Sequence, residues 1–91
     1  MRPIHPTDLD LVTRTLLACD PPHRRDLARR IVSNAETADR YRKRTGRLHP
    51  EFGAGTLGSA AQGFPRARAL AHCDAPYRHC LLILLEALAT P

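Results

Sequence analysis

The stretch from Asp20 to Gly46 constrains the fold most, because its caps, periodicity and length all predict one long helix. Asp20 is a favoured N-cap residue. Pro21 at the first helical position loses no hydrogen bond, since that N–H has no partner within the helix. Gly46 follows the last periodic residue and can adopt the left-handed conformation that ends a helix. We therefore predict a helix over residues 21–45, roughly 37 Å long at about 1.5 Å per residue.

This helix has an apolar stripe in its first part only. At 3.6 residues per turn, one side carries Leu27, Ala28, Ile31, Val32, Ala35 and Ala38. The stripe then ends, because Arg42 falls where the next apolar residue belongs. Asp39 and Lys43 form an acid-before-base pair four residues apart, which supports a helix on an exposed surface. We predict that the first half packs against the rest of the chain and that the last two turns project into solvent.

A shorter helix is predicted before the long one. Residues 1–6 contain two prolines and are expected to form an extended arm. Thr7 and Asp10 have the spacing of a capping box, and apolar residues then follow at spacings of three and four. The pattern predicts a helix over about residues 7–19. Because almost no chain separates it from the long helix, the two should form a helix hairpin.

A glycine-rich loop is predicted in the middle of the chain. Residues 46–56 include a proline and several glycines, with Leu48 and Phe52 as the expected apolar anchors. Short helical turns are predicted at 56–62 and 66–72.

A final helix is predicted over about residues 75–89, where Asp74 repeats the start signal. Its apolar residues cover nearly the whole circumference, so a single neighbouring helix cannot bury them all. The helix is therefore expected to be either the central pillar of the fold or part of an interface with another copy of the chain. The candidates for this homo-oligomer interface are Leu81, Leu82, Ile83, Leu85 and Leu88. Taken together, residues 1–91 predict one small all-α domain, built on the hairpin and the final helix.

Positive charge is concentrated in the long helix. The formal net charge is +5, and residues 24–47 hold nine basic and three acidic residues. A dense cluster at the end of the helix consists of Arg40, Arg42, Lys43, Arg44 and Arg47. Guanidinium groups match phosphate oxygens, so this cluster predicts non-specific DNA binding. An acidic protein surface is the alternative partner, and cations that merely oppose the helix dipole are a third interpretation.

Other chemistries receive weaker support from the sequence. Gly53 to Gly58 spells G-x-G-x-x-G, but no buried strand precedes it, so a turn is favoured over a dinucleotide site. His72-Cys73 and His79-Cys80 supply enough donors for zinc. However, adjacent helical residues point about 100° apart, so the two doublets are unsuited to one metal ion. No serine or cysteine lies in a recognisable nucleophile motif. We therefore expect a non-enzymatic protein without a metal or cofactor.

The cellular location is expected to be the cytoplasm. Three cysteines form no dense disulfide framework, and the first residues include acids where a signal peptide requires an apolar run. No segment reaches the 18 or so apolar residues of a membrane span, so no membrane association is expected.

The proline-containing start, the stretch AETADRYRKRTGRLHPEFGAGTL from Ala35 to Leu57 and the leucine-rich end resemble a small alphaproteobacterial family. That family is associated with the head of a phage-like gene transfer agent cluster, and the chain looks like a small terminase subunit. The resemblance implies a non-enzymatic DNA-packaging protein, with a large terminase subunit as partner. Small terminases also carry a helix-turn-helix domain, which is not evident in this chain, so contacts would fall to the DNA backbone. The alternative is an adaptor or small regulator that uses the basic helix on an acidic partner.

Overall fold

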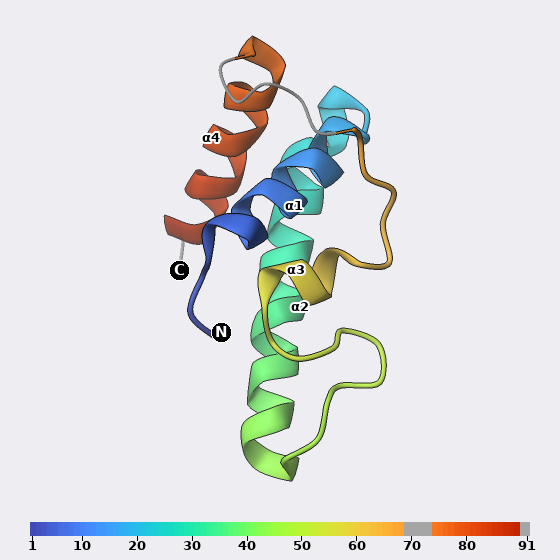
Figure 1. Ribbon diagram of the computed structural model, residues 1–91, viewed down its shortest axis with the longest axis vertical. Coiled ribbons are helices and arrows are strands. Elements are labelled where there is room, and N and C mark those ends of the chain that lie inside the picture. The colour runs from blue at the N-terminus through green and yellow to red at the C-terminus, as the bar shows by residue number, and fades with distance from the viewer. Residues whose placement is uncertain (69–73, 90–91) are drawn as a thin grey trace.

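The computed structural model describes residues 1–68 and 74–89, and over these residues it consists of helices joined by turns and loops (Figure 1). The predicted all-α fold is therefore confirmed. The elements are α1 (Pro6–Leu17), a short 3-10 helix η1 (Pro21–His23), α2 (Arg24–Thr45), α3 (Leu57–Ala61) and α4 (Ala75–Ala89).

The first helix starts and ends earlier than predicted. Its N-cap is His5, whose backbone N–H donates to the Asp8 carboxylate at 3.1 Å, and Pro6 takes the first helical position. The predicted capping box at Thr7 is therefore wrong, because the proline starts the helix one residue sooner. At the other end, where the helix stops early, the Arg24 guanidinium donates to the carbonyls of Leu16, Leu17 and Cys19. The Leu16 carbonyl also accepts from the Cys19 N–H at 3.1 Å.

The long helix ends as predicted, whereas its first turn differs. The chain leaves Asp20 through η1, where the His23 N–H donates to the Asp20 carbonyl at 2.9 Å, and the α-helix begins at Arg24. Gly46 has a φ of 72°, and its N–H donates to the Arg42 carbonyl at 2.8 Å. These 22 residues span about 33 Å. Since the molecule measures 41 × 25 × 21 Å, α2 sets its long axis.

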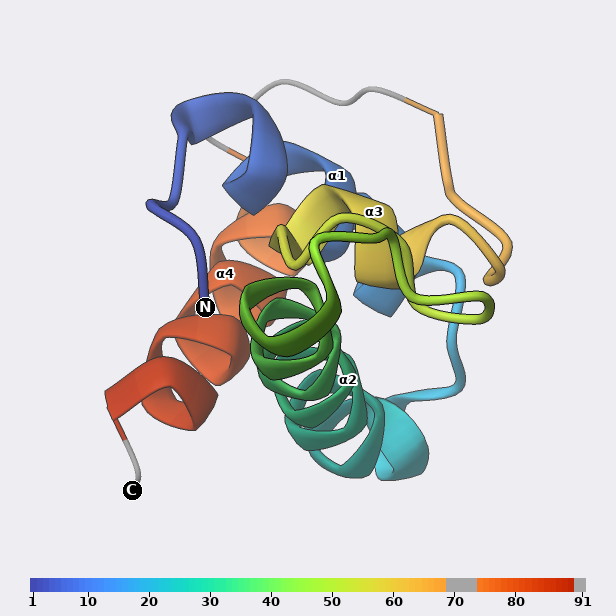
Figure 2. The same ribbon diagram turned by 90° about the horizontal axis from the view of Figure 1, so that it is seen from below.

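The core lies where the other helices meet one side of α2. Figure 2, a view nearly along α2, shows α1, α3 and α4 grouped around part of its circumference. The predicted apolar stripe faces them: Leu27 is partly buried, and the other five residues are buried. Val12 and Leu16 of α1 and Leu84 of α4 complete this core with no exposed surface.

The short helix α3 lies within the predicted 56–62 turn. Thr56 is its N-cap, and the Thr56 hydroxyl accepts a hydrogen bond from the Ser59 N–H at 3.1 Å. The other predicted turn, at 66–72, falls partly outside the described residues, and its first three residues are not helical. The predicted helix at 75–89 is confirmed with the same bounds.

Candidate nucleic-acid interface

The predicted cation cluster surrounds the last turns of α2 and the turn that follows. We call it the basic end, consisting of Arg40, Arg42, Lys43, Arg44 and Arg47. All of its side chains are exposed except that of Arg42, which is half-buried. The glycine stop at Gly46 directs the chain back toward the core, so Arg47 stays close to the four cations of the helix.

The end of α2 does not project freely, which corrects the prediction. The segment after Gly46 returns along the helix, and the His49 ring stacks on Phe52, with the ring centroids 4.6 Å apart. The same imidazole meets the edge of Tyr41 at 5.1 Å. Phe52 is half-buried and stacks on His49 within the loop, whereas Leu48, the other predicted anchor, is 60% exposed; the contact with α2 is made by His49. Aromatic stacking around His49 holds the loop in place of the predicted leucine.

Besides Arg40, which donates to the Thr37 hydroxyl of the same helix at 3.4 Å, two arginines of the basic end contact the protein itself. The Arg42 guanidinium donates to the Ala54 carbonyl at 3.4 Å, which ties the returning loop to the helix. The Arg44 guanidinium lies over the Tyr41 ring, 5.8 Å from its centroid. Neither arginine forms an ion pair with an acidic residue among the residues described. Both therefore keep their positive charge uncompensated by a direct carboxylate partner.

Asp39 is the buried centre of this region. Its side chain accepts from the Met1 ammonium at 3.1 Å and from Lys43 Nζ at 2.9 Å, and the residue is only 3% exposed. The hydrogen bond from Lys43 is the main reason why the pKa of Asp39 lies below its usual value. The Met1 ammonium acts in the same direction, and burial opposes it. Asp39 is thus a structural carboxylate shared by two cations.

The backbone of the glycine loop packs directly against Asp39. Gly55 has a φ of 92°, and a side chain there would place its Cβ 2.9 Å from the Asp39 Cα. The Arg2 N–H donates to the Gly55 carbonyl at 3.1 Å, and Arg2 Nε donates to the Ala54 carbonyl at 3.3 Å. The N-terminal arm, the loop and α2 therefore meet at one point, which fixes the position of the basic end.

Sequence reasoning treated Asp39 as an exposed partner of Lys43 and missed its burial. A signal was present in the spacing. Asp39 lies four residues after Ala35 and seven after Val32, which places it on the buried stripe. An acidic residue on that stripe needs cations close by, and Lys43 supplies one of them.

The G-x-G-x-x-G stretch does not form a nucleotide site in this fold. The Gly58 N–H at the start of α3 donates to the Asp8 carboxylate at 3.3 Å, so a carboxylate of the chain itself occupies this position. Before the stretch lies an isolated pairing of His49 with Gly53, in place of the buried strand that such a site requires.

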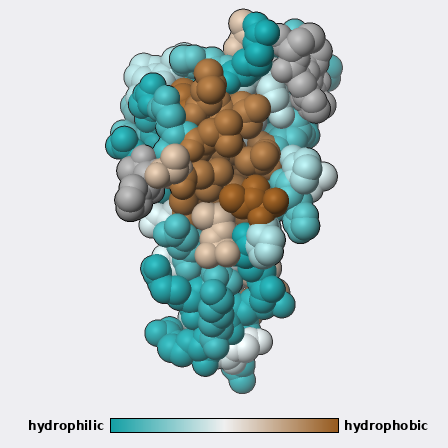
Figure 3. Space-filling view, turned by 90° about the vertical axis from the view of Figure 1, so that its left-hand side faces the viewer, coloured by the Kyte–Doolittle hydropathy of each residue, from teal (hydrophilic) through white to brown (hydrophobic). Residues whose placement is uncertain are grey.

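The residues predicted for an oligomer interface divide into two groups. Leu82 is 58% exposed and Leu85 is 43% exposed, while Leu81 and Leu88 are partly buried. Ile83, in contrast, is 5% exposed and packs in the core of its own chain, so it cannot belong to a surface patch. The reason is that α4 uses its Ile83 side to contact α1 and α2. Figure 3 shows an apolar patch over the outer side of α4.

A family model described as a domain of unknown function, DUF7742, matches residues 2–88. The chain belongs to this family. The match runs from the arm into the last turn of α4, so the basic end and the apolar patch are both parts of the DUF7742 domain. No curated protein and no solved structure matches the chain.

The zinc donors considered in the sequence fall partly outside the described residues of the DUF7742 domain, because these exclude His72 and Cys73. His79 is exposed and Cys80 is fully buried, and burial raises the pKa of the Cys80 thiol. Within residues 1–68 and 74–89, no three His, Cys, Asp or Glu side chains converge as metal ligands. Over the same residues, no helix combines the length and apolar character needed to cross a bilayer.

Proposed function

We propose that this chain is a non-enzymatic, DNA-associated subunit of the small-terminase type, which contacts the DNA backbone through the basic end. The observation that carries the proposal is the exposure of Arg40, Lys43, Arg44 and Arg47 around one helix end. Guanidinium groups present several N–H donors in a geometry that matches phosphate oxygens. Binding at this surface would neutralise several neighbouring phosphates.

The local charge balance supports a negatively charged partner. Residues 39–51 hold five cations and two carboxylates, Asp39 and Glu51. The Asp39 carboxylate is buried and already shared between Lys43 and the Met1 ammonium. It is therefore poorly placed to compensate the arginines. Flexible side chains around a helix end and turn suit phosphate contacts rather than a fixed pattern of base edges. We expect binding that is insensitive to sequence and strongly dependent on salt.

Arg42 has a different role within the same surface. Because it is half-buried and donates to the Ala54 carbonyl, it holds the loop against α2 while adding to the positive potential. Substituting Arg42 would disturb the loop as well as the charge, so it is a poor choice for a binding test.

The second part of the proposal is assembly through α4 into a homo-oligomer. Leu82 and Leu85 are large apolar side chains exposed on one side of this helix. A grouped apolar surface of this kind is typical of an interaction site. In the packaging role, the assembled subunits would present several basic ends to DNA, and a large terminase subunit would be the further partner.

DNA binding is tested by removing three exposed cations from the basic end. The variant carries Arg40→Gln, Arg44→Gln and Arg47→Gln. A matched control carries Arg29→Gln, Arg66→Gln and Arg78→Gln, which removes the same charge from exposed residues elsewhere. Affinity for a short random-sequence duplex is measured by fluorescence anisotropy over a series of salt concentrations. Circular dichroism checks that both variants remain folded.

The salt dependence gives the expected magnitude. Each neutralised phosphate contributes about 0.9 to the slope of log affinity against log salt, so losing three contacts should reduce the slope by up to roughly 2.7. The control should change the slope by much less. Unchanged affinity in the basic-end variant would refute DNA binding there and leave an acidic protein partner as the alternative. An equal loss in both variants would refute the assignment to this surface.

Assembly is tested separately by size-exclusion chromatography with light scattering. We expect the wild-type chain to form an oligomer and the Leu82→Gln, Leu85→Gln double variant to be monomeric. A monomeric wild type at the highest attainable concentration would refute assembly through α4, whatever the result with DNA.

A further inference from the structure

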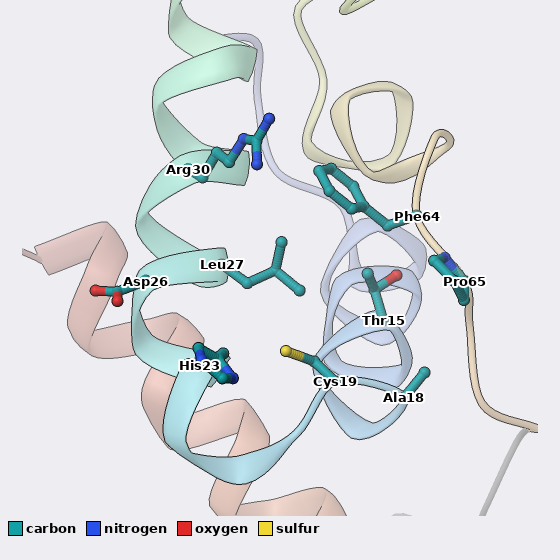
Figure 4. Close-up of a pocket in the computed structure, with 9 residues that line it drawn as sticks. All are labelled: Thr15, Ala18, Cys19, His23, Asp26, Leu27, Arg30, Phe64 and Pro65. Carbon is teal, nitrogen blue, oxygen red and sulfur yellow. The ribbon is translucent and has the colours of Figure 1, made fainter.

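A pocket of about 380 Å³ lies at the opposite end of α2 from the basic end. It is formed by the last turn of α1 with the residues that follow it, by His23 of η1, by the first two turns of α2 and by the segment at Phe64 and Pro65 (Figure 4). Its volume falls at the lower end of the 300–1,000 Å³ typical of small-molecule sites. The pocket shares no lining residue with the basic end, so it is independent of the proposed DNA contact.

The walls of this pocket are mainly apolar. Leu27 points into it from α2, and the Phe64 ring faces it from the opposite side (Figure 4). Ala18 and Pro65 extend the apolar surface on the Phe64 side. Both Leu27 and Phe64 are packed against the core while remaining partly exposed, so their orientation is set by the fold. A flat aromatic or branched aliphatic group would be covered on two sides here.

The cationic side chain of Arg30 lies at the edge of the apolar walls. The Arg30 guanidinium lies over the Phe64 ring, 5.7 Å from its centroid, and the residue is exposed. No carboxylate lies within ion-pair distance of it among the residues described. Asp26, one turn earlier, directs its carboxylate away from Leu27 and Phe64 (Figure 4). Arg25, in contrast, is paired with Glu86.

We propose that this pocket binds a small carboxylate with an aromatic or branched aliphatic body. The carboxylate accepts hydrogen bonds from the Arg30 guanidinium, which offers parallel N–H donors of the matching geometry. The body lies between Leu27 and Phe64 and reaches toward the Cys19 thiol, which also lines the pocket. A neutral ligand of the same shape would gain the apolar contacts without the charge-assisted hydrogen bonds.

The test compares 3-phenylpropionate with its neutral isostere 3-phenylpropanamide, using ¹H–¹⁵N NMR titrations of the full chain. We expect the carboxylate to perturb the amides of Leu27, Phe64 and Cys19, and to bind about tenfold more tightly than the amide, the scale of a hydrogen bond to a charged group. Arg30→Gln should abolish this preference. Arg29→Gln removes a neighbouring exposed charge that does not line the pocket, and it should retain the preference.

A second readout uses the Cys19 thiol, which lines the pocket. Cys19 is partly exposed, whereas Cys80 is fully buried and serves as an unreactive reference. Saturating 3-phenylpropionate should slow alkylation of Cys19 by N-ethylmaleimide, as followed by peptide mass spectrometry. Equal affinity for the carboxylate and the amide, or a preference that persists in Arg30→Gln, would overturn the role of the guanidinium. Absence of amide perturbation and of Cys19 protection at all ligand concentrations would overturn the site.

Discussion

Truncating two leucines of the same helix should give opposite results. Leu84 has no exposed surface and packs in the core with residues of α1 and α2, whereas Leu82, two residues earlier, is 58% exposed. Leu84→Ala and Leu82→Ala remove the same atoms from the same helix. Their difference therefore reports burial alone, because helix propensity and residue chemistry cancel.

The structure gives the size of each effect. Removing a fully buried leucine side chain leaves a cavity and costs about 2.7–5 kcal/mol. Fully burying a leucine is worth about 1.5–3 kcal/mol, and less than half of Leu82 is buried, so Leu82→Ala should cost about 1 kcal/mol or less. A chain of 91 residues is expected to have a total stability of about 5–14 kcal/mol. Leu84→Ala should thus remove a large share of it.

Urea unfolding followed by circular dichroism measures both free energies. With an m value of about 1–3 kcal/mol per M, a loss of 3 kcal/mol lowers the midpoint by about 1–3 M. The measurement should be made at low protein concentration, since any oligomer would add stability by mass action. If Leu82→Ala destabilises the dilute protein as much as Leu84→Ala, the assignment of the inner and outer sides of α4 is wrong.

Three further predictions concern Asp39, the glycine loop and Tyr77. The folded-state pKa of Asp39 is lowered, mainly by the hydrogen bond from Lys43. The ionised Asp39 therefore stabilises the folded protein above pH 4 or so, and this stabilisation is lost as the pH falls through the folded pKa. Urea midpoints of Asp39→Asn should fall less between neutral and acid pH than those of the wild type. Gly55→Ala should destabilise the fold by more than about 1 kcal/mol in thermal unfolding, because the positive φ of Gly55 and its contact with the Asp39 backbone both disfavour a side chain. Gly63→Ala should be nearly neutral, because a Cβ added there would meet nothing within 4 Å. Equal effects of the two substitutions would contradict the packing of the loop. Burial, assisted by the hydrogen bond to Asp10, raises the pKa of Tyr77. The tyrosinate absorbance of Tyr77, assigned by comparison with Tyr77→Phe, should therefore appear only above pH 10 or so. The free energy of unfolding should decrease as the pH rises past that value.

The sequence was most informative where local signals and the hydrophobic pattern agreed. The stripe from Leu27 to Ala38, the glycine stop at Gly46 and the helix at 75–89 are all present in the structure. Each depends on neighbours within a few turns, so spacing alone predicts it. The cap of α1 was misplaced because Thr7 and Pro6 are both plausible starts, and only the observed contact between His5 and Asp8 distinguishes them.

The return of the loop could not be read from spacing, because it depends on contacts between different segments of the chain. His49 meets Tyr41, Arg2 meets Ala54, and Gly55 packs on Asp39. Periodicity records which side of a helix is buried but does not identify the segment that covers it. The sequence therefore favours an apolar residue such as Leu48 as the anchor, whereas in the structure His49, stacked on Phe52, makes the contact with Tyr41 of α2.

The burial of Asp39 also affects how well the basic end can serve as a binding surface. A binding site gains from a backbone whose position is fixed before the partner arrives, because less conformational entropy is then lost on binding. The junction around Asp39 fixes the backbone beneath Arg40 and Lys43, and the loop fixes the turn that carries Arg47. The side chains above it remain exposed and can adjust to phosphates. A cation cluster on a freely projecting helix end would lack this support, so the corrected geometry favours a binding surface more than the predicted one did.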